Sequence, residues 1–181
     1  MLNILLAILI RMVIPTGKLR RYCSQIKIVL TDVDGVLTDG GMYYTSDGDI
    51  MKKFHVRDGM GVNLLRRNGI PTIIVTKEKS KIIKSWSKKM NVLQVYDGIQ
   101  NKFLLLEKIC KKHNLKEKNF AYIGDDINDV ELLKHVGFSA VPSDVSKDMK
   151  KIPHYICENS GGSGAFREIA DLIIKFKVKS K

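Results

Sequence analysis

Short apolar runs alternate with helix-like segments along most of this chain, and that alternation constrains the fold more than any other feature. Strand-like runs are predicted at 26–32, 71–76, 92–96, 120–125, 138–141 and 154–158. Helices are predicted at 58–68, 79–90, 100–113, 127–135, 144–150 and 164–176. Such alternation is typical of α/β proteins in which helices cover both faces of a mostly parallel sheet. The sequence therefore predicts a doubly wound α/β fold.

One segment departs from this alternation. Residues 42–55 form two short extended runs around Asp47-Gly48, a strong signal for a β-hairpin. No repeat or linker divides the rest, and 181 residues suffice for one domain with its own core. We therefore expect one compact domain over 25–181, preceded by an extension over 1–24.

The extension begins with the apolar stretch "MLNILLAILIRMVI". This stretch is shorter than the roughly 20 residues that span a bilayer. It also lacks the basic start and cleavage site of a secretory signal. We expect residues 1–14 to pack locally or be disordered, with weak contact to a membrane surface as the alternative.

The chain is strongly basic, with a formal net charge of +12. This charge favours an anionic partner, such as a phosphorylated metabolite, nucleic acid or an acidic membrane. The lysines follow helix-like spacing, and no recognition motif or aromatic platform accompanies them, so we expect no nucleic-acid partner. Three scattered cysteines form no zinc or disulfide pattern, which favours a reducing, cytoplasmic location.

Polar residues follow several predicted strands at the point where each ends. Asp32 and Asp34 follow the first, Thr76 the second, and Asp125 and Asp126 follow 120–124. Lys102, which opens a helix, can reach the same edge. Because ligands of open α/β sheets bind outside the carboxyl ends of the strands, we expect one cluster there.

Converging carboxylates repel one another unless a cation neutralises them. Oxygen ligands of this kind suit Mg²⁺, which commonly also holds substrate phosphate. Asp32 could then attack phosphorus as a nucleophile while Asp34 acts as general acid and base. Gly35 leaves backbone amides free to approach phosphate, and Thr76 and Lys102 can donate to it.

Four motifs in order carry a resemblance to the haloacid dehalogenase-like phosphatases. They are "DVDGVLTDG", Thr76 at a strand end, Lys102 in "GIQNK", and "GDDIND". The resemblance implies that Asp32 is the nucleophile and Asp34 the general acid/base. It further implies that Asp125 holds Mg²⁺ together with Asp32 and the Asp34 carbonyl. Gly35, Thr76 and Lys102 would bind phosphate.

Residues 25–175 resemble more narrowly the small branch that acts on phosphates of 2-keto-3-deoxy sugar acids. The signs are the hairpin, "FHVRDGMGVNLL" and "SGGSGAFREI". The resemblance implies a small hairpin in place of a cap domain and a homotetramer in which hairpins meet. A glycine-rich tail, made flexible by Gly161, Gly162 and Gly164, would cover a neighbour's site. The resemblance implies that Arg57 and Asp58 line the substrate entrance.

The substrate expected within this branch depends on the segment "TKEKS". Phosphatases of 3-deoxy-D-manno-octulosonate 8-phosphate, a precursor of lipopolysaccharide, usually carry an arginine where this chain has Glu78. Phosphatases of nine-carbon acids such as sialic acid carry a glutamate there and a lysine eleven residues later, which Lys89 supplies. We therefore expect a nine-carbon 9-phosphate, with the eight-carbon ester as the alternative.

Other interpretations stay open. Asp126 and Asp129 could support the metal site from outside or cap a helix. Arg57, Glu78 and Lys89 could be solvated surface charges. The chain also resembles the catalytically silent tetramerisation module of some sialic-acid cytidylyltransferases, but the intact set of acidic and lysine residues favours an enzyme.

Overall fold

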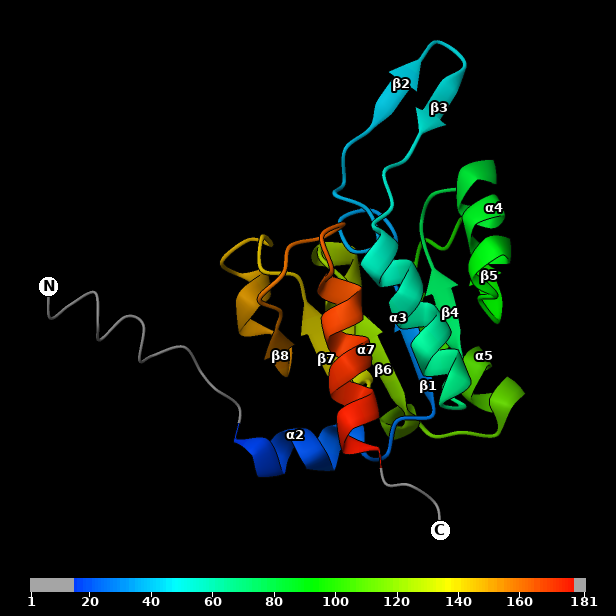
Figure 1. The fold of residues 1–181 in the computed structure, drawn as a ribbon. Helices are drawn as coiled ribbons and strands as arrows, with labels where there is room; N and C mark the ends of the chain where they lie inside the picture. Colours follow the sequence, from blue (N-terminus) through cyan, green and yellow to red (C-terminus); the bar gives the residue numbers. More distant parts are fainter. Residues whose placement is uncertain (1–14, 178–181) are drawn as a thin grey trace, which may run out of the picture.

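A six-stranded parallel sheet forms the centre of the computed structural model, which describes residues 15–177 (Figure 1). In order across the sheet, the strands are β5 (Gln94–Tyr96), β4 (Thr72–Val75), β1 (Ile28–Thr31), β6 (Phe120–Ile123), β7 (Phe138–Val141) and β8 (Tyr155–Ile156). All neighbouring pairs are parallel. The predicted α/β fold is therefore confirmed.

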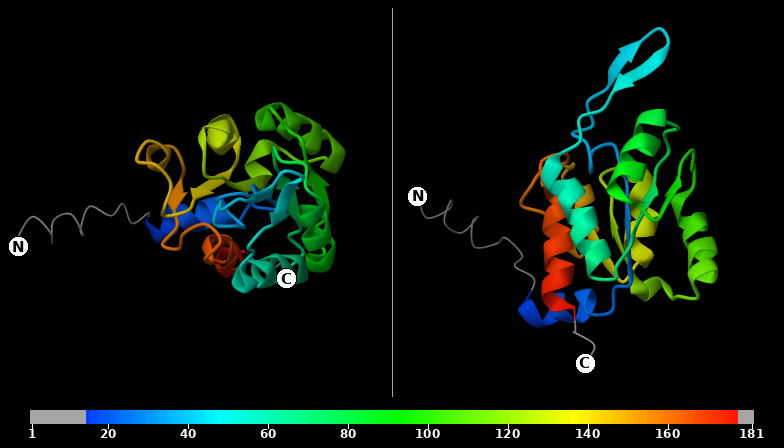
Figure 2. Two further views of the ribbon diagram at one scale, coloured as in Figure 1. Left: turned by 90° about the horizontal axis from the view of Figure 1, so that it is seen from above. Right: turned by 45° about the vertical axis from the view of Figure 1, so that its right-hand side comes forward.

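Helices cover both faces of this sheet, and each face has its own apolar cluster. One cluster joins the sheet to α3 (Val56–Arg67), α4 (Lys81–Met90) and α7 (Ala165–Phe176). The other joins it to α5 (Lys102–His113) and α6 (Val130–His135). Figure 2 shows α3 and α7 on one side of the sheet and α6 on the other. The central strands are buried on both faces, which explains their almost uniformly apolar sequences.

The strand register sets which residues meet at the carboxyl edge of the sheet. Thr31 lies opposite Ile74 of β4 and Ile123 of β6. The loops that follow β1 and β6 therefore leave the sheet at the same level, and β4 ends beside them. Residues directly after these three strands are thereby brought together, as the alternating pattern predicted.

A two-stranded hairpin projects beyond this edge (Figure 1). Its strands, β2 (Tyr43–Thr45) and β3 (Gly48–Met51), pair antiparallel, with Thr45 opposite Gly48. The two turn residues are thus Ser46 and Asp47, and Gly48 has a φ of +109°. The predicted hairpin is present, with its turn one residue earlier than Asp47-Gly48.

Two predicted helices differ in the structure. The helix predicted at 144–150 is only a short 3₁₀ turn, η3 (Met149–Lys151), in an otherwise irregular segment. The helix predicted to open at Asp58 begins at Val56, because the His55 side chain accepts a hydrogen bond from the Arg57 N–H and caps it. It ends before Gly69, as predicted, where φ is +71°. Two further 3₁₀ turns, η1 (Glu117–Asn119) and η2 (Ile127–Asp129), flank β6.

Part of the predicted extension is folded onto the domain. Helix α2 (Thr16–Cys23) packs against α7, at the end of the molecule opposite the hairpin (Figure 1). Cys23 is buried in the core, and the Tyr22 ring lies 4.4 Å from that of His154. Residues 1–14, for which local packing, disorder or membrane contact was expected, lie outside the described residues. Within residues 15–177, every helix is too short or too polar to cross a bilayer.

Candidate active site

A hollow of about 360 Å³ opens at the carboxyl edge of the sheet, beside the ends of β1, β4 and β6. It brings together seven of the residues predicted for the site. These are Asp32, Asp34, Gly35, Thr76, Glu78, Asp125 and Asp126. Gly40, Lys77, Ile127 and Asn128 complete its lining.

Asp32 directly follows β1 and is almost completely buried. Its Oδ1 accepts a hydrogen bond from the Val33 N–H at 2.7 Å, and its Oδ2 lies 2.6 Å from Lys102 Nζ. Burial raises the pKa of Asp32 to about 7, although Lys102 acts in the opposite direction. The side chain is therefore a carboxylate held in place, but one whose charge is poorly solvated.

Lys102 is the first residue of α5, and its side chain is fully buried. Its ammonium group contacts Asp32 at 2.6 Å and Asp129 at 2.7 Å. Burial alone would lower the pKa of Lys102, but the two carboxylates outweigh it and the pKa is raised. The ammonium group therefore stays charged next to the predicted nucleophile.

Asp129 organises the base of the site and is fully buried. Its Oδ1 accepts hydrogen bonds from Lys102 Nζ and from the Tyr122 hydroxyl at 2.6 Å. Its Oδ2 accepts from the backbone N–H groups of Asp125 at 2.9 Å and Asp126 at 3.3 Å. Asp129 thus fixes both Lys102 and the loop after β6.

Asp126 caps the short η2 turn. Its Oδ1 accepts from the Ile127 N–H at 2.8 Å, and the residue also lines the hollow. The structure therefore places Asp126 at a helix-capping position on the rim, whereas Asp129 lies beneath it.

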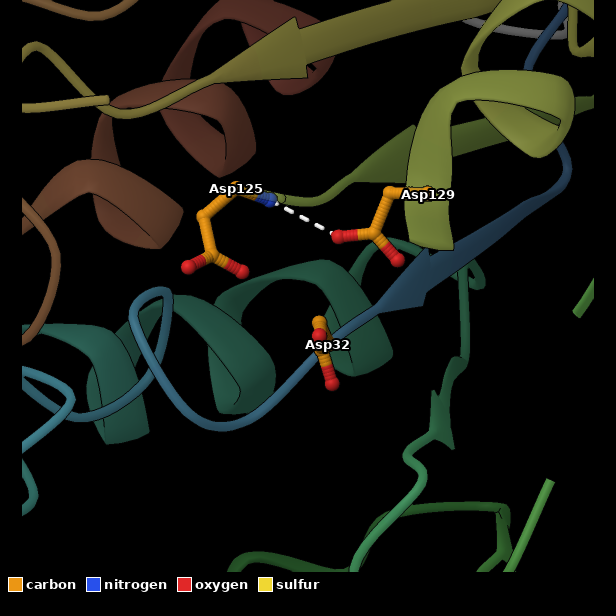
Figure 3. Close-up of side chains that lie close together, drawn as sticks. All are labelled: Asp32, Asp125 and Asp129. Atoms are coloured by element: carbon orange, nitrogen blue, oxygen red, sulfur yellow. Dashed lines mark hydrogen bonds between the residues drawn. The ribbon is translucent and has the colours of Figure 1, made fainter. Parts of the chain in front are cut away.

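Three carboxylates from two strand ends come close enough to share a cation. Asp32, Asp125 and Asp129 each offer an oxygen, and these oxygens lie within 4.8 Å of one another (Figure 3). Burial and the neighbouring carboxylates of Asp32 and Asp129 raise the pKa of Asp125 to about 8. Asp32 and Asp125 line the hollow, whereas Asp129 is fully buried and does not, so Asp32 and Asp125 are the better ligands. Crowded carboxylates of this kind fit a hard divalent ion such as Mg²⁺.

Asp34 lies two residues beyond Asp32 and faces the same hollow. Its Oδ1 accepts from Lys52 Nζ at 2.8 Å and from the Thr38 hydroxyl at 3.3 Å. Its Oδ2 is buried without a hydrogen-bond donor among residues 15–177. The side chain is thus oriented through one oxygen.

Gly35 needs the absence of a side chain for two reasons. Its φ is +83°, and a Cβ there would lie 2.0 Å from Asp125 Oδ2. The loop after β1 can therefore press directly against the Asp125 carboxylate. Thr76, one residue beyond β4, is buried, and its hydroxyl accepts from the Glu78 N–H at 3.3 Å.

The glycine-rich segment expected as a flexible tail packs against the same loop. A Cβ on Gly161 would lie 2.0 Å from the Gly35 carbonyl oxygen, and the Gly162 N–H donates to Val36 O at 2.9 Å. Within this chain, the expectation of a flexible tail is wrong: its glycines permit close backbone packing beside the nucleophile loop.

Three of the residues predicted to bind substrate lie elsewhere. Asp58 is fully buried and accepts hydrogen bonds from the N–H groups of Gly164 and Arg167, so it anchors the start of α7 instead of facing substrate. Burial raises its pKa. Arg57 lines a separate hollow beside α7, and Lys89 lines two hollows beside Phe54 and Trp86.

Two residues of the site were not predicted from the sequence. Lys52 contacts Asp34, and Tyr122 contacts both Lys102 and Asp129. Lys52 lies in a pair of adjacent lysines that is typical of solvated surface, and Tyr122 is typical of a buried strand residue. Only the pairing of the strands and the position of the hairpin reveal their contacts.

Comparisons with known proteins agree with this geometry. Residues 70–169 match the family model described as haloacid dehalogenase-like hydrolase. The 3-deoxy-D-manno-octulosonate 8-phosphate phosphatases of Salmonella typhi and Escherichia coli K12 are each 32% identical over 151 residues. In both cases the match covers 83% of this chain and 80% of the relative.

Solved structures of such phosphatases share the fold. The Moraxella catarrhalis enzyme, in complex with magnesium ion, phosphate ion and a KDO molecule, has a TM-score of 0.86 and 31% identity. That match covers 89% of this chain and 92% of the other. A cobalt-bound deoxy-D-mannose-octulosonate 8-phosphate phosphatase from Haemophilus influenzae has a TM-score of 0.83 and 32% identity, covering 88% and 91%.

The family match spans more than half of the chain, and the relatives exceed 30% identity over most of its length. The fold and the order of the motifs agree with them. The chain therefore belongs to the haloacid dehalogenase-like hydrolases, as a phosphatase of the capless branch that includes the 3-deoxy-D-manno-octulosonate 8-phosphate phosphatases.

Proposed function

We propose that this protein is a Mg²⁺-dependent phosphatase that releases phosphate from 3-deoxy-D-manno-octulosonate 8-phosphate through a phosphorylated Asp32. The observation that carries the proposal is the convergence of Asp32, Asp34 and Asp125 in one hollow, with the buried Lys102 ammonium group in contact with Asp32. It is supported by a related structure that contains magnesium, phosphate and KDO.

Asp32 and Asp125, with the backbone carbonyl of Asp34, are the proposed ligands of the metal. Mg²⁺ supplies positive charge that neutralises these groups and the phosphate oxygens. The raised pKa values of Asp32 and Asp125 fit this proposal, because both carboxylates are buried where their charges need compensation. Asp129 accepts a hydrogen bond from the Asp125 N–H, and Lys102 contacts Asp32, so these two residues keep the ligands in position.

The first step is attack by an Asp32 carboxylate oxygen on phosphorus. A bond forms from that oxygen to phosphorus while the bond from phosphorus to the sugar oxygen breaks. Asp34 gives its proton to the departing oxygen. Lys102 keeps Asp32 oriented, and Thr76 and the loop at Gly35 bind the phosphate oxygens.

The second step regenerates Asp32. Asp34 takes a proton from water, whose oxygen bonds to phosphorus as the bond to Asp32 breaks. Inorganic phosphate leaves, and Asp34 is again protonated for the next turnover. Asp34 therefore needs the same position in both steps, first as acid and then as base.

The relatives favour the eight-carbon ester as substrate over the nine-carbon ester that the sequence favoured. The related proteins reported above are phosphatases of the eight-carbon ester. The nine-carbon expectation depended on Glu78 acting together with Lys89, yet Glu78 lines the hollow at Asp32 and Lys89 lines others. A nine-carbon 9-phosphate is therefore the natural competitor in an assay.

The test is a steady-state comparison of phosphate release from the two esters with Mg²⁺. We expect a higher kcat/KM for the eight-carbon ester. Asp32→Asn should lower turnover by at least about 10³-fold while leaving the fold intact. Asp148→Asn, which changes an exposed aspartate outside the lining of the hollow, is the matched control. Full activity of Asp32→Asn would contradict the proposed nucleophile.

We also propose that the protein assembles through its hairpin and acts in a reducing compartment such as the cytoplasm. The hairpin exposes Met42, Tyr44, Ile50 and Met51, each more than half accessible. Such a surface favours contact with other copies of the chain. All three cysteines are free.

A further inference from the structure

Lys52 is a buried lysine at the base of the hairpin, directly after β3. Only 2% of its side chain is exposed. Burial of a lysine is costly unless its charge is paired. Lys52 Nζ lies 2.8 Å from Asp34 Oδ1, so part of this cost is offset by the residue proposed to transfer protons.

The next residue provides a contrast. Lys53 is 60% exposed and contacts Asp39 at 3.0 Å, at the surface. Two adjacent lysines of one segment therefore form ion pairs with two aspartates of one loop. Only the pair formed by Lys52 reaches the hollow that contains Asp32.

The contacts of Asp34 make its orientation depend on Lys52. Its Oδ1 accepts from Lys52 at 2.8 Å and, over a longer 3.3 Å, from the Thr38 hydroxyl. Its Oδ2 has no hydrogen-bond donor among the described residues. Without Lys52, one long hydrogen bond to Thr38 would remain to hold the carboxylate. Reaction rates are sensitive to such changes, because a misplacement of 1 Å can cost about 100-fold.

We propose that Lys52 is a positioning residue that holds Asp34 in the orientation required for proton transfer to the sugar oxygen. This inference rests on the proposed function. It also implies that the hairpin has a part in the reaction, since a residue at its base fixes a group in the active site.

The experiment compares two phosphate esters in single-turnover measurements with Mg²⁺. The eight-carbon sugar phosphate has a poor leaving group that needs a proton from Asp34, whereas 4-nitrophenyl phosphate has a good one that does not. Release of sugar and of nitrophenolate is measured for the wild type, Lys52→Met, Lys52→Arg and Lys53→Met.

We expect Lys52→Met to slow sugar release by at least about 10-fold and nitrophenolate release by less than about 2-fold. The concentration that gives half of the maximal single-turnover rate with the sugar phosphate should change little. Lys52→Arg restores a cation to the same carboxylate and should recover part of the lost rate. Lys53→Met should behave as the wild type.

Equal rates in Lys52→Met and the wild type, or equal slowing of both esters, would overturn this assignment while the proposed function stands. Circular dichroism identifies a variant that is misfolded; in that case the assignment depends on Lys52→Arg, whose slowing must be confined to the sugar ester. A wild type that releases neither leaving group would instead overturn the proposed function.

Discussion

Asp32 and Asp125 are carboxylates that the fold buries and places close together. Their pKa values are raised to about 7 and about 8, whereas an aspartate in an unfolded chain titrates near about 3.9. Between about pH 4 and 8, the folded metal-free protein therefore binds more protons than the unfolded chain. Its free energy of unfolding should fall as the pH rises through this range.

This first prediction is checked by thermal unfolding of the metal-free protein between pH 5 and 8, with Asp125→Asn as reference. The wild type should lose more stability than the reference as the pH rises. Because Mg²⁺ binds the ionised carboxylates, its stabilising effect should be larger at pH 8 than at pH 5. A wild type and reference with parallel pH profiles would contradict the expectation.

Asp129 leads to a prediction about stability. Asp129→Asn replaces one acceptor oxygen by a donor, so either the Lys102–Tyr122 pair or the two backbone N–H groups lose their partner. Disrupting a buried ion pair in this way should cost about 3 kcal/mol of unfolding free energy. Asp126→Asn, at an exposed capping position where asparagine is also favourable, should cost less than about 1 kcal/mol. Denaturant unfolding of both variants measures the difference, and similar values would argue against the network.

Among the elements of the fold, the segment 160–164 supports the nucleophile loop most directly. A Cβ on Gly161 would meet the backbone carbonyl of Gly35, which cannot move aside as a flexible side chain would. Gly161→Ala should therefore destabilise the protein by about 2 kcal/mol and lower kcat by displacing Gly35. Gly17→Ala is the control, since its Cβ would meet no atom within 4 Å. Unfolding curves and phosphate release test both variants, and an unaffected Gly161→Ala would contradict this support.

The elements that the sequence predicted correctly are those with a local signal. Buried strands such as β1 are almost entirely apolar. Asp32 directly follows β1, and Asp125 is separated from β6 only by Gly124, so periodicity and parallel topology together place them. Asp58 and Lys52 have no such local signal. Asp58 lies in the first turn of α3, where polar residues are usually solvated, and only the packing of α3 against α7 buries it. Lys52 is buried only because the hairpin base lies against the nucleophile loop. The segment predicted as a helix at 144–150 is instead irregular apart from the short turn η3.

At the scale of the whole molecule, the hairpin is the feature that a single chain does not explain. It contacts the domain at its base and projects beyond the sheet (Figure 1). A two-stranded hairpin alone is at best marginally stable in water, and this one exposes several large apolar side chains. Contact between hairpins of different copies would bury that surface.

We therefore expect the wild type to sediment as an oligomer, with a mass well above the 20.5 kDa of one chain. The double variant Tyr44→Asp and Ile50→Asp introduces charges on the exposed hairpin side chains, 65% and 59% accessible, and should sediment as a monomer. Leu104→Asp, at a comparably exposed apolar residue of α5, should leave the mass unchanged. Sedimentation equilibrium distinguishes these cases. A monomeric wild type, or dissociation by Leu104→Asp alone, would exclude the hairpin as the site of assembly.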